Sequence, residues 1–184
     1  MTPADLDAIR SRIRRASAAA RDASGSGYQT SYWAEGTDFI TNFKAIGVKA
    51  PEQLEDDFLN LFVWIWSLKD YLKLCFVAKG LEANRCQALT FVADIANRAK
   101  HGDLRESRSG EFAELVEVGL NAPQECIERI TFAGPDVTLQ IKDPQMVSIY
   151  ATVATRSGRR YDALVVLNEA MECWEAKVLT QIGA

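Results

Sequence analysis

The chain has 184 residues, which is the size of one domain and excludes a second independent enzyme-sized domain. Apolar residues make up 48% and charged residues 25%, so a packed core is expected and wholesale disorder is excluded. The net charge of -4 argues against a broad basic surface that coats duplex nucleic acid, although a small local phosphate site remains compatible with it.

The sequence predicts a cytoplasmic protein with no membrane partner. No stretch of about 18 uninterrupted apolar residues occurs, because the richest candidate, 58–77, contains Lys69, Asp70 and Lys73. The amino terminus lacks the apolar core of a signal peptide. The four cysteines are far apart and the chain has a single histidine, so no metal site is expected. Reduced thiols are predicted, with pairing across the fold left open.

The first half of the chain predicts helices. Apolar residues at spacings of three and four, after Pro3 and Asp5, indicate a first helix that ends near residue 23. A Ser-Gly-rich loop follows, and the apolar residues of 32–46 indicate a second helix. The third helix starts at Pro51 and ends near Gly80. Its apolar surface is broad, which places it at the centre of a bundle or in a dimer interface.

The fourth helix is expected over 82–101, antiparallel to the third because the connection between them is short. Beyond residue 102 the pattern favours short strands at 112–120, 127–133, 137–141 and 147–155, although 112–120 is also compatible with a helix. The turn at Gly134, Pro135 and Asp136 predicts a hairpin between the second and third of these strands.

From Asp162 onward, apolar spacings of three and four indicate a terminal helix. The alternative is a strand over 164–167 followed by a helix capped at Asn168. The predicted fold is α+β: mainly a helical bundle of four to five helices, with a small antiparallel sheet of three to four strands. Residues 1–102 would form the bundle, and 103–184 the sheet and the returning helix, as one compact unit.

The polar side of the fourth helix carries the candidate chemistry. The polar residues Gln87, Thr90, Asp94, Asn97 and His101 fall within a sector of roughly 80° at 100° per residue. An imidazole with a pKa near neutrality can transfer a proton, and neighbouring cations can stabilise charge on a phosphate. These are the parts needed for metal-independent RNA cleavage, in which the ribose 2'-hydroxyl attacks the adjacent phosphate, and no cofactor is expected. A solvated helix end has the same composition.

A long helix ending in ANRAKH resembles the HEPN superfamily, small helical domains that include toxin, abortive-infection and other defence ribonucleases, usually as homodimers. In this sequence Asn97 and His101 match the polar residue and the histidine of the family's signature, and Ala96 stands where the signature has arginine. The resemblance implies a homodimer that cleaves RNA or binds RNA or a nucleotide, in a stress or phage-defence setting. His101 would then be the general acid or base, and Asn97 would orient it or the ribose.

Basic residues near the same helix end would hold phosphate, with acidic residues in supporting roles. The candidates for phosphate binding are Arg98, Lys100 and Arg105, and the candidates for support are Asp94 and Asp70. Asp70 lies in the most apolar helix, so it is predicted to be a buried acid paired with Arg85, Arg98 or Lys100. The competing hypothesis is a non-enzymatic, homodimeric protein-interaction module.

Overall fold

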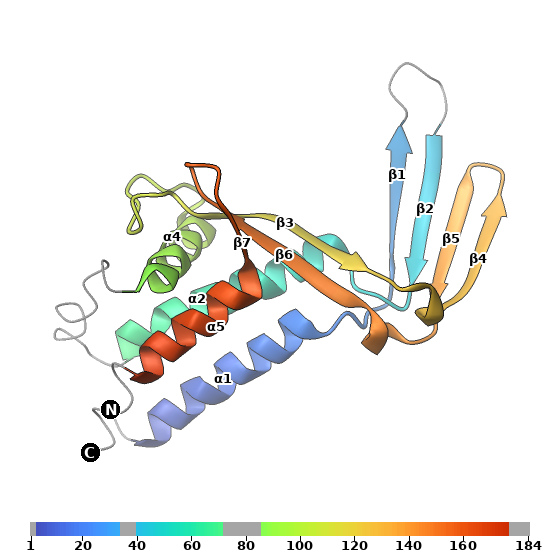
Figure 1. The fold of residues 1–184 in the computed structure, drawn as a ribbon. Helices are drawn as coiled ribbons and strands as arrows, with labels where there is room; N and C mark the ends of the chain where they lie inside the picture. Colours follow the sequence, from blue (N-terminus) through green and yellow to red (C-terminus); the bar gives the residue numbers. More distant parts are fainter. Residues whose placement is uncertain (1–2, 34–39, 72–85, 177–184) are drawn as a thin grey trace.

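The computed structural model describes residues 3–33, 40–71 and 86–176 (Figure 1). These residues contain four α-helices and seven strands, and the strands form one sheet of four and one of three. The α+β class is therefore confirmed. The expectation of a mainly helical bundle with one small antiparallel sheet is wrong, because nearly twice the expected number of strands is present and one pair of strands is parallel.

Three helices lie alongside one another, and a fourth crosses them near one end (Figure 1). The helices are α1 (Pro3–Arg21), α2 (Pro51–Tyr71), α4 (Gln87–His101) and α5 (Ala163–Trp174). The predicted apolar stripe of α1 is confirmed, since Ile9, Ile13, Ala16 and Ala20 are all buried. α5 begins at the predicted place, because the side chain of Asp162 accepts hydrogen bonds from the backbone of Leu164 and Val165 and caps the helix. The alternative strand over 164–167 is wrong.

The broad apolar surface of α2 is covered within the protomer. α2 packs against α1, α4, α5 and strand β3 (Glu114–Asn121), and its residues Leu54, Phe58 and Phe62 are fully buried. Its two tryptophans are partly buried under cations: the Arg12 guanidinium lies 5.1 Å from the Trp64 ring, and the Lys69 ammonium 4.1 Å from the Trp66 ring. The breadth of this helix thus does not require a second subunit, and the homodimer stays a prediction.

α4 crosses α2 instead of running antiparallel along it, which corrects the prediction. Lys100, in the last turn of α4, donates a hydrogen bond to Ser67 in the last turns of α2, with 3.3 Å between Nζ and Oγ. The carboxyl ends of the two helices therefore lie together. The connection 72–85, including the expected helix end at Gly80 and the expected start at 82, lies outside the described residues.

The three-stranded sheet lies against the helices and confirms 112–120 as a strand rather than a helix. Its strands, in spatial order, are β3, β6 (Ser148–Ala154) and β7 (Arg160–Asp162), all antiparallel. The register between β3 and β6 shifts between Leu115 and Glu117, so Val116 is an extra residue in the ladder. Leu115 and Val118 therefore both pack against the core, although they are three residues apart.

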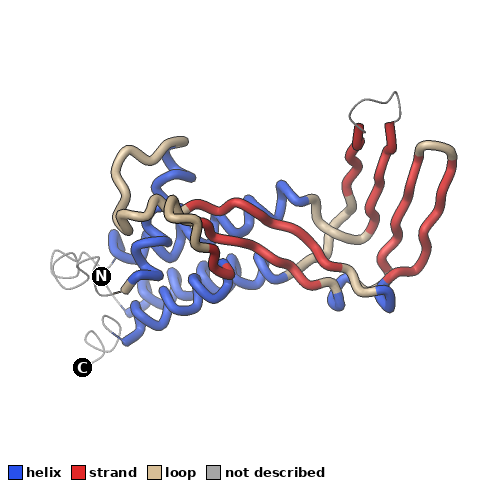
Figure 2. The backbone as a smooth tube through the Cα atoms, turned by 45° about the horizontal axis from the view of Figure 1, so that its top comes forward, coloured by secondary structure: helices blue, strands red, loops and turns tan. Residues whose placement is uncertain are grey.

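The four-stranded sheet stands away from the helices (Figures 1 and 2). Its strands, in spatial order, are β1 (Tyr28–Trp33), β2 (Ile40–Ile46), β5 (Asp136–Ile141) and β4 (Ile127–Ala133). The predicted second helix over 32–46 is wrong, because β1 and β2 occupy its described residues. The reason is long-range pairing: β1 pairs with β2, β2 pairs with β5, and these ladders outweigh the local apolar spacings of three and four.

This sheet combines strands from both sides of residue 102. β2 pairs with β5 in parallel, whereas β1 with β2 and β4 with β5 pair in antiparallel fashion. The β4–β5 hairpin confirms the predicted turn at Gly134 to Asp136. A small second core of six buried residues lies at the base of the sheet: Ala23, Ala45, Val48, Cys126, Ile141 and Val147.

Two of the cysteines are joined, contrary to the expectation of reduced thiols. Cys86, at the start of α4, forms a disulfide with Cys173 near the end of α5, and Cys126 is a buried free thiol. Cys75 lies outside the described residues. A search of the described helices finds none with the length and apolarity that spanning a bilayer would need.

Candidate functional site

The candidate catalytic pair lies at the exposed end of α4. Gly102 takes a left-handed conformation and donates its amide to the carbonyl of Arg98, which ends the helix directly after His101. The His101 side chain is exposed, and Asn97, one turn earlier, is half-buried. Within the described part of the chain, no side-chain hydrogen bond orients the imidazole. The structure thus gives His101 no sheltered concave surroundings.

The three predicted phosphate ligands do not converge on His101. Arg98 pairs with Glu114 of β3, with 3.1 Å between the guanidinium nitrogen and the carboxylate oxygen. Lys100 is directed to Ser67 on α2, and Arg105 is exposed in the loop after α4. The three basic side chains therefore lie in three different places.

Asp94 is fully buried and holds the loop that follows α4. Its carboxylate accepts hydrogen bonds of 2.6 Å from the Ser107 hydroxyl, the Arg108 amide and the Ser109 hydroxyl, and one of 3.3 Å from the Ala113 amide. Asp94 shares no hydrogen bond with Asn97 or His101 in the described structure. It is therefore a structural anchor, and this loop covers the polar side of α4 at Asp94.

Asp70 is exposed, so the prediction of a buried acid is wrong. The helix that carries it leaves this side open at its carboxyl end, and Arg98 is paired with Glu114 instead. The neighbouring Lys69 is half-buried on Trp66, and burial lowers the pKa of its ammonium. The charge of Asp70 opposes that shift, while the cations Arg108 and Lys100 lower the pKa further. Arg85, the other proposed partner, lies outside the described residues.

A different feature stands out on the four-stranded sheet, whose two faces differ in polarity. The pairing register places one set of alternate residues on a single face, and that face is almost entirely apolar and free of charge. We call it the apolar sheet face. Its members are Tyr28, Thr30, Tyr32, Thr41, Phe43, Ala45, Ile127, Ile130, Phe132, Val137, Leu139 and Ile141.

The opposite face carries the polar and charged residues. Gln29, Ser31, Asn42, Lys44, Arg129, Thr131, Asp136, Thr138 and Gln140 lie there, together with Trp33, Ile40 and Ala133. Hydrogen bonds link several of them across the strands, such as Ser31 to Asn42 and Asn42 to Asp136, both at 2.8 Å. A sheet with one apolar and one polar face normally buries the apolar one.

The described residues of the chain cover only the base of the apolar sheet face. Ala45 and Ile141 are buried in the small second core, whereas Tyr32, Ile130 and Phe132 are 57%, 47% and 73% exposed. At about 200 Å² for a full aromatic side chain, Tyr32 and Phe132 alone expose roughly 250 Å². Tyr32 and Phe132 lie on opposite edge strands, and the half-buried Phe43 and Val137 lie on the two strands between them. The apolar surface therefore runs across the sheet, as it does at interaction surfaces.

The exposed aromatic rings are ordered by their neighbours. The Phe43 ring lies 6.1 Å from that of Tyr28 and 6.5 Å from that of Tyr32, in tilted and edge-on arrangements. Burial raises the pKa of Tyr28, and its neighbours Tyr32, Glu52 and Tyr150 raise it further. Tyr28 packs against the small second core, as do Leu120 of β3 and Ile149 of β6.

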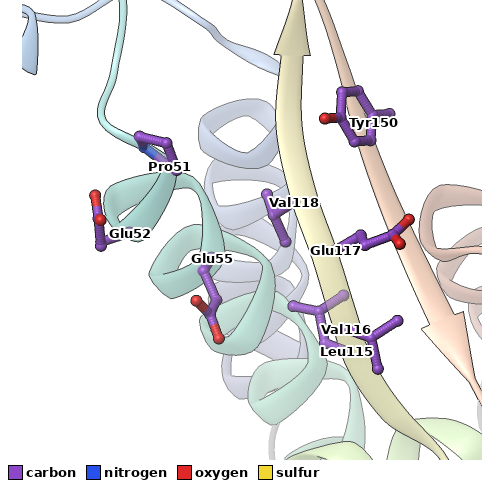
Figure 3. A pocket seen from close by; sticks show the side chains of 8 residues that line it. All are labelled: Pro51, Glu52, Glu55, Leu115, Val116, Glu117, Val118 and Tyr150. Carbon is purple, nitrogen blue, oxygen red and sulfur yellow. The ribbon is translucent and has the colours of Figure 1, made fainter. Parts of the chain in front are cut away.

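A pocket of about 350 Å³ lies between the first turns of α2 and strands β3 and β6 (Figure 3). It is near the second core, because Pro51 in its lining follows Val48 of that core by three residues. Its lining combines apolar and acidic side chains: Pro51, Glu52, Glu55, Leu115, Val116, Glu117, Val118 and Tyr150. The Tyr150 ring lies across Gly119, where a larger residue would meet it. Glu117 pairs with Arg160, whereas Glu52 and Glu55 are exposed and have no ion pair among the described residues. The pocket therefore has an unneutralised acidic side.

Comparison with known protein families, curated proteins and solved structures found no match to this chain. The relation to the HEPN superfamily therefore stays a prediction.

Sequence reasoning missed both the anchoring loop and the apolar sheet face. Two serines separated by one residue, Ser107 and Ser109, stand in a polar loop and are the available signal for a buried carboxylate partner. For the sheet face, the available signal is Phe43 and Ala45 two residues apart in Ile40–Ile46, but Ile40 and Ile46 on the other side of the strand weaken that pattern.

Proposed function

We propose that this chain is a non-enzymatic protein-interaction module that binds its partner through the apolar sheet face. The observation that carries the proposal is the uncovered outer half of this face, where Tyr32 is exposed on the edge strand β1 and Ile130 and Phe132 are exposed on the opposite edge strand β4. Covering roughly 250 Å² of aromatic surface contributes about 6 kcal/mol at 25 cal/mol per Å², before the entropy cost of association. A partner that covers this face gains that hydrophobic free energy on binding.

The carboxyl end of α4 also favours an interaction module over an RNA-cleaving enzyme. Proton transfer between substrate atoms requires an imidazole within hydrogen-bonding reach of the reacting group, in a site that positions that group. His101 is exposed, Arg98 is paired with Glu114, and Asp94 is committed to its loop. These residues give a substrate no common binding surface.

The proposal is tested by site-specific photo-cross-linking in the native cells. A benzophenone amino acid replaces Phe132 in one variant and Thr131, which lies on the opposite face of the same strand, in the matched control. We expect a discrete adduct from position 132 and none from position 131, with mass spectrometry identifying the cross-linked peptide. Equal adduct patterns from both positions, or none from either, would reject the proposal.

A stability measurement checks that the Phe132 side chain is not needed for folding. Because Phe132 is 73% exposed, Phe132→Ser should change the free energy of unfolding by no more than about 0.5 kcal/mol. Urea unfolding of the purified protein checks this. A large loss of stability would mean that the ring belongs to the core of the protomer and not to a binding surface.

A further inference from the structure

We infer that the occupant of the apolar sheet face is an amphipathic helix of another protein that also carries Lys or Arg residues. This inference rests on the proposed function and names the chemistry of its partner. It is carried by the juxtaposition of an uncharged apolar sheet face with an acidic pocket near its base. Val48, Leu120 and Ile149 belong to or pack against the small second core at that base. The pocket is lined by Pro51, Val118 and Tyr150, each one to three residues along the chain from one of them.

The dimensions of the sheet fit a helix. Strands of six or seven residues, at about 3.3 Å each, give a face roughly 20 Å long, and four strands about 4.8 Å apart make it roughly 15 Å wide. A helix of about 14 residues is roughly 21 Å long and 10 Å in diameter. One amphipathic helix therefore spans the length of the face and about two thirds of its width.

The charge at the border selects a basic partner. Glu52 and Glu55 are three residues apart on α2, so they lie on one side of the helix, and both line the pocket. Their place in the first turns of α2 suits the helix dipole but leaves both carboxylates without a cation among the described residues. Lys or Arg side chains at one end of a docked helix would supply the missing charge.

The same charges disfavour a second copy of this chain. In a two-fold dimer both copies present the same face, and the apolar sheet face contains no Lys or Arg. The basic residues of this sheet, Lys44 and Arg129, lie on its opposite face. A second copy docked in this way therefore brings no cation to Glu52 and Glu55.

The test uses the purified full chain and two fluorescent 18-residue helical peptides. One peptide combines a leucine face with lysines, and the other has glutamate in place of every lysine. Fluorescence anisotropy measures both affinities at near-physiological salt. We expect the leucine–lysine peptide to bind at least tenfold more tightly than its glutamate counterpart. Equal affinities would overturn the inference.

Matched variants locate the binding site. Phe132→Ser should weaken binding of the leucine–lysine peptide at least tenfold, whereas Val165→Ser, at a similarly exposed apolar position on α5, should leave it unchanged. The double variant Glu52→Gln with Glu55→Gln should weaken binding about fivefold, as expected for two exposed charge pairs.

A second pair of glutamates controls for the net negative charge of the protein. Glu169 and Glu172 are also exposed and three residues apart, on α5, so Glu169→Gln with Glu172→Gln removes the same charge elsewhere. We expect no change in affinity from this control. An equal loss from both double variants would show non-specific attraction and would overturn the inference.

The two proposals fail in different ways. If sedimentation shows a dimer that Phe132→Ser dissociates, or if the cross-linked partner is acidic, the interaction surface stands and the basic helix is wrong. If position 132 gives no specific cross-link in cells, the proposed function itself fails.

Discussion

Removing the Asp94 carboxylate should cost a large part of the stability of this protein. Asp94 has no exposed surface and accepts four hydrogen bonds, two of them from the backbone amides of Arg108 and Ala113. In Asp94→Ala the hydroxyls of Ser107 and Ser109, 3.1 Å apart, can turn toward each other, but the two amides lose their acceptor. An unsatisfied buried donor costs about 1 to 3 kcal/mol, so we expect a loss of about 3 to 5 kcal/mol in the free energy of unfolding.

The assay is urea unfolding at neutral pH followed by far-ultraviolet circular dichroism. Asp94→Asn should also destabilise, because the amide has one acceptor oxygen and directs its own donors at the loop amides. Asn97→Ala, one turn later and half-buried, is the matched control and should cost less than about 1 kcal/mol. A loss below about 1 kcal/mol for Asp94→Ala would refute the assignment of this carboxylate as the loop anchor.

Three further predictions concern other parts of the chain. The disulfide between Cys86 and Cys173 joins residues 87 apart, so in the chain-entropy model its reduction should lower the free energy of unfolding by about 4.6 kcal/mol. Denaturation with and without reductant measures this loss. Alkylation of both thiols in the unreduced native protein would contradict the bond. Hydrogen bonding and the charge of Arg160 hold the pKa of Glu117 below 4.5, so the stability from this pair is present above pH 4.5 and is lost as the pH falls through the folded-state pKa. Arg160→Gln should raise that pKa in a carboxyl NMR titration, and an unchanged value would refute the pairing. Incubation with total RNA in EDTA should give the same traces for the wild-type protein and His101→Ala, whereas cleavage by the wild type alone would favour the HEPN hypothesis.

The disulfide prediction also bears on the compartment. Disulfides persist in oxidising surroundings and are rare in the cytoplasm. The state of Cys86 and Cys173 in the native cells, trapped by alkylation during lysis, therefore tests the expected cytoplasmic location. Reduced thiols would agree with that location, and an intact bond would speak against it.

The sequence by itself determined the elements that local patterns specify. Pro3 and Pro51 open helices whose apolar spacing survives in the buried stripes of α1 and α2, and the turn at Gly134 to Asp136 makes the predicted hairpin. Alternation of apolar residues likewise identified β4, β5 and β6 within a residue or two. These features depend on residues a few positions apart, so the sequence alone is enough to predict them.

Only the tertiary structure decided what the polar and apolar faces do. The polar side of α4 was compatible with a catalytic surface, and the fold covers Asp94 with a loop whose donors lie 13 to 19 residues away in the sequence. The apolar sheet face exists because β2 pairs with β5 across about 90 residues, which no local pattern specifies. Helical spacing could show which side chains share a face, but burial and exposure of that face depend on segments that the chain brings together only on folding.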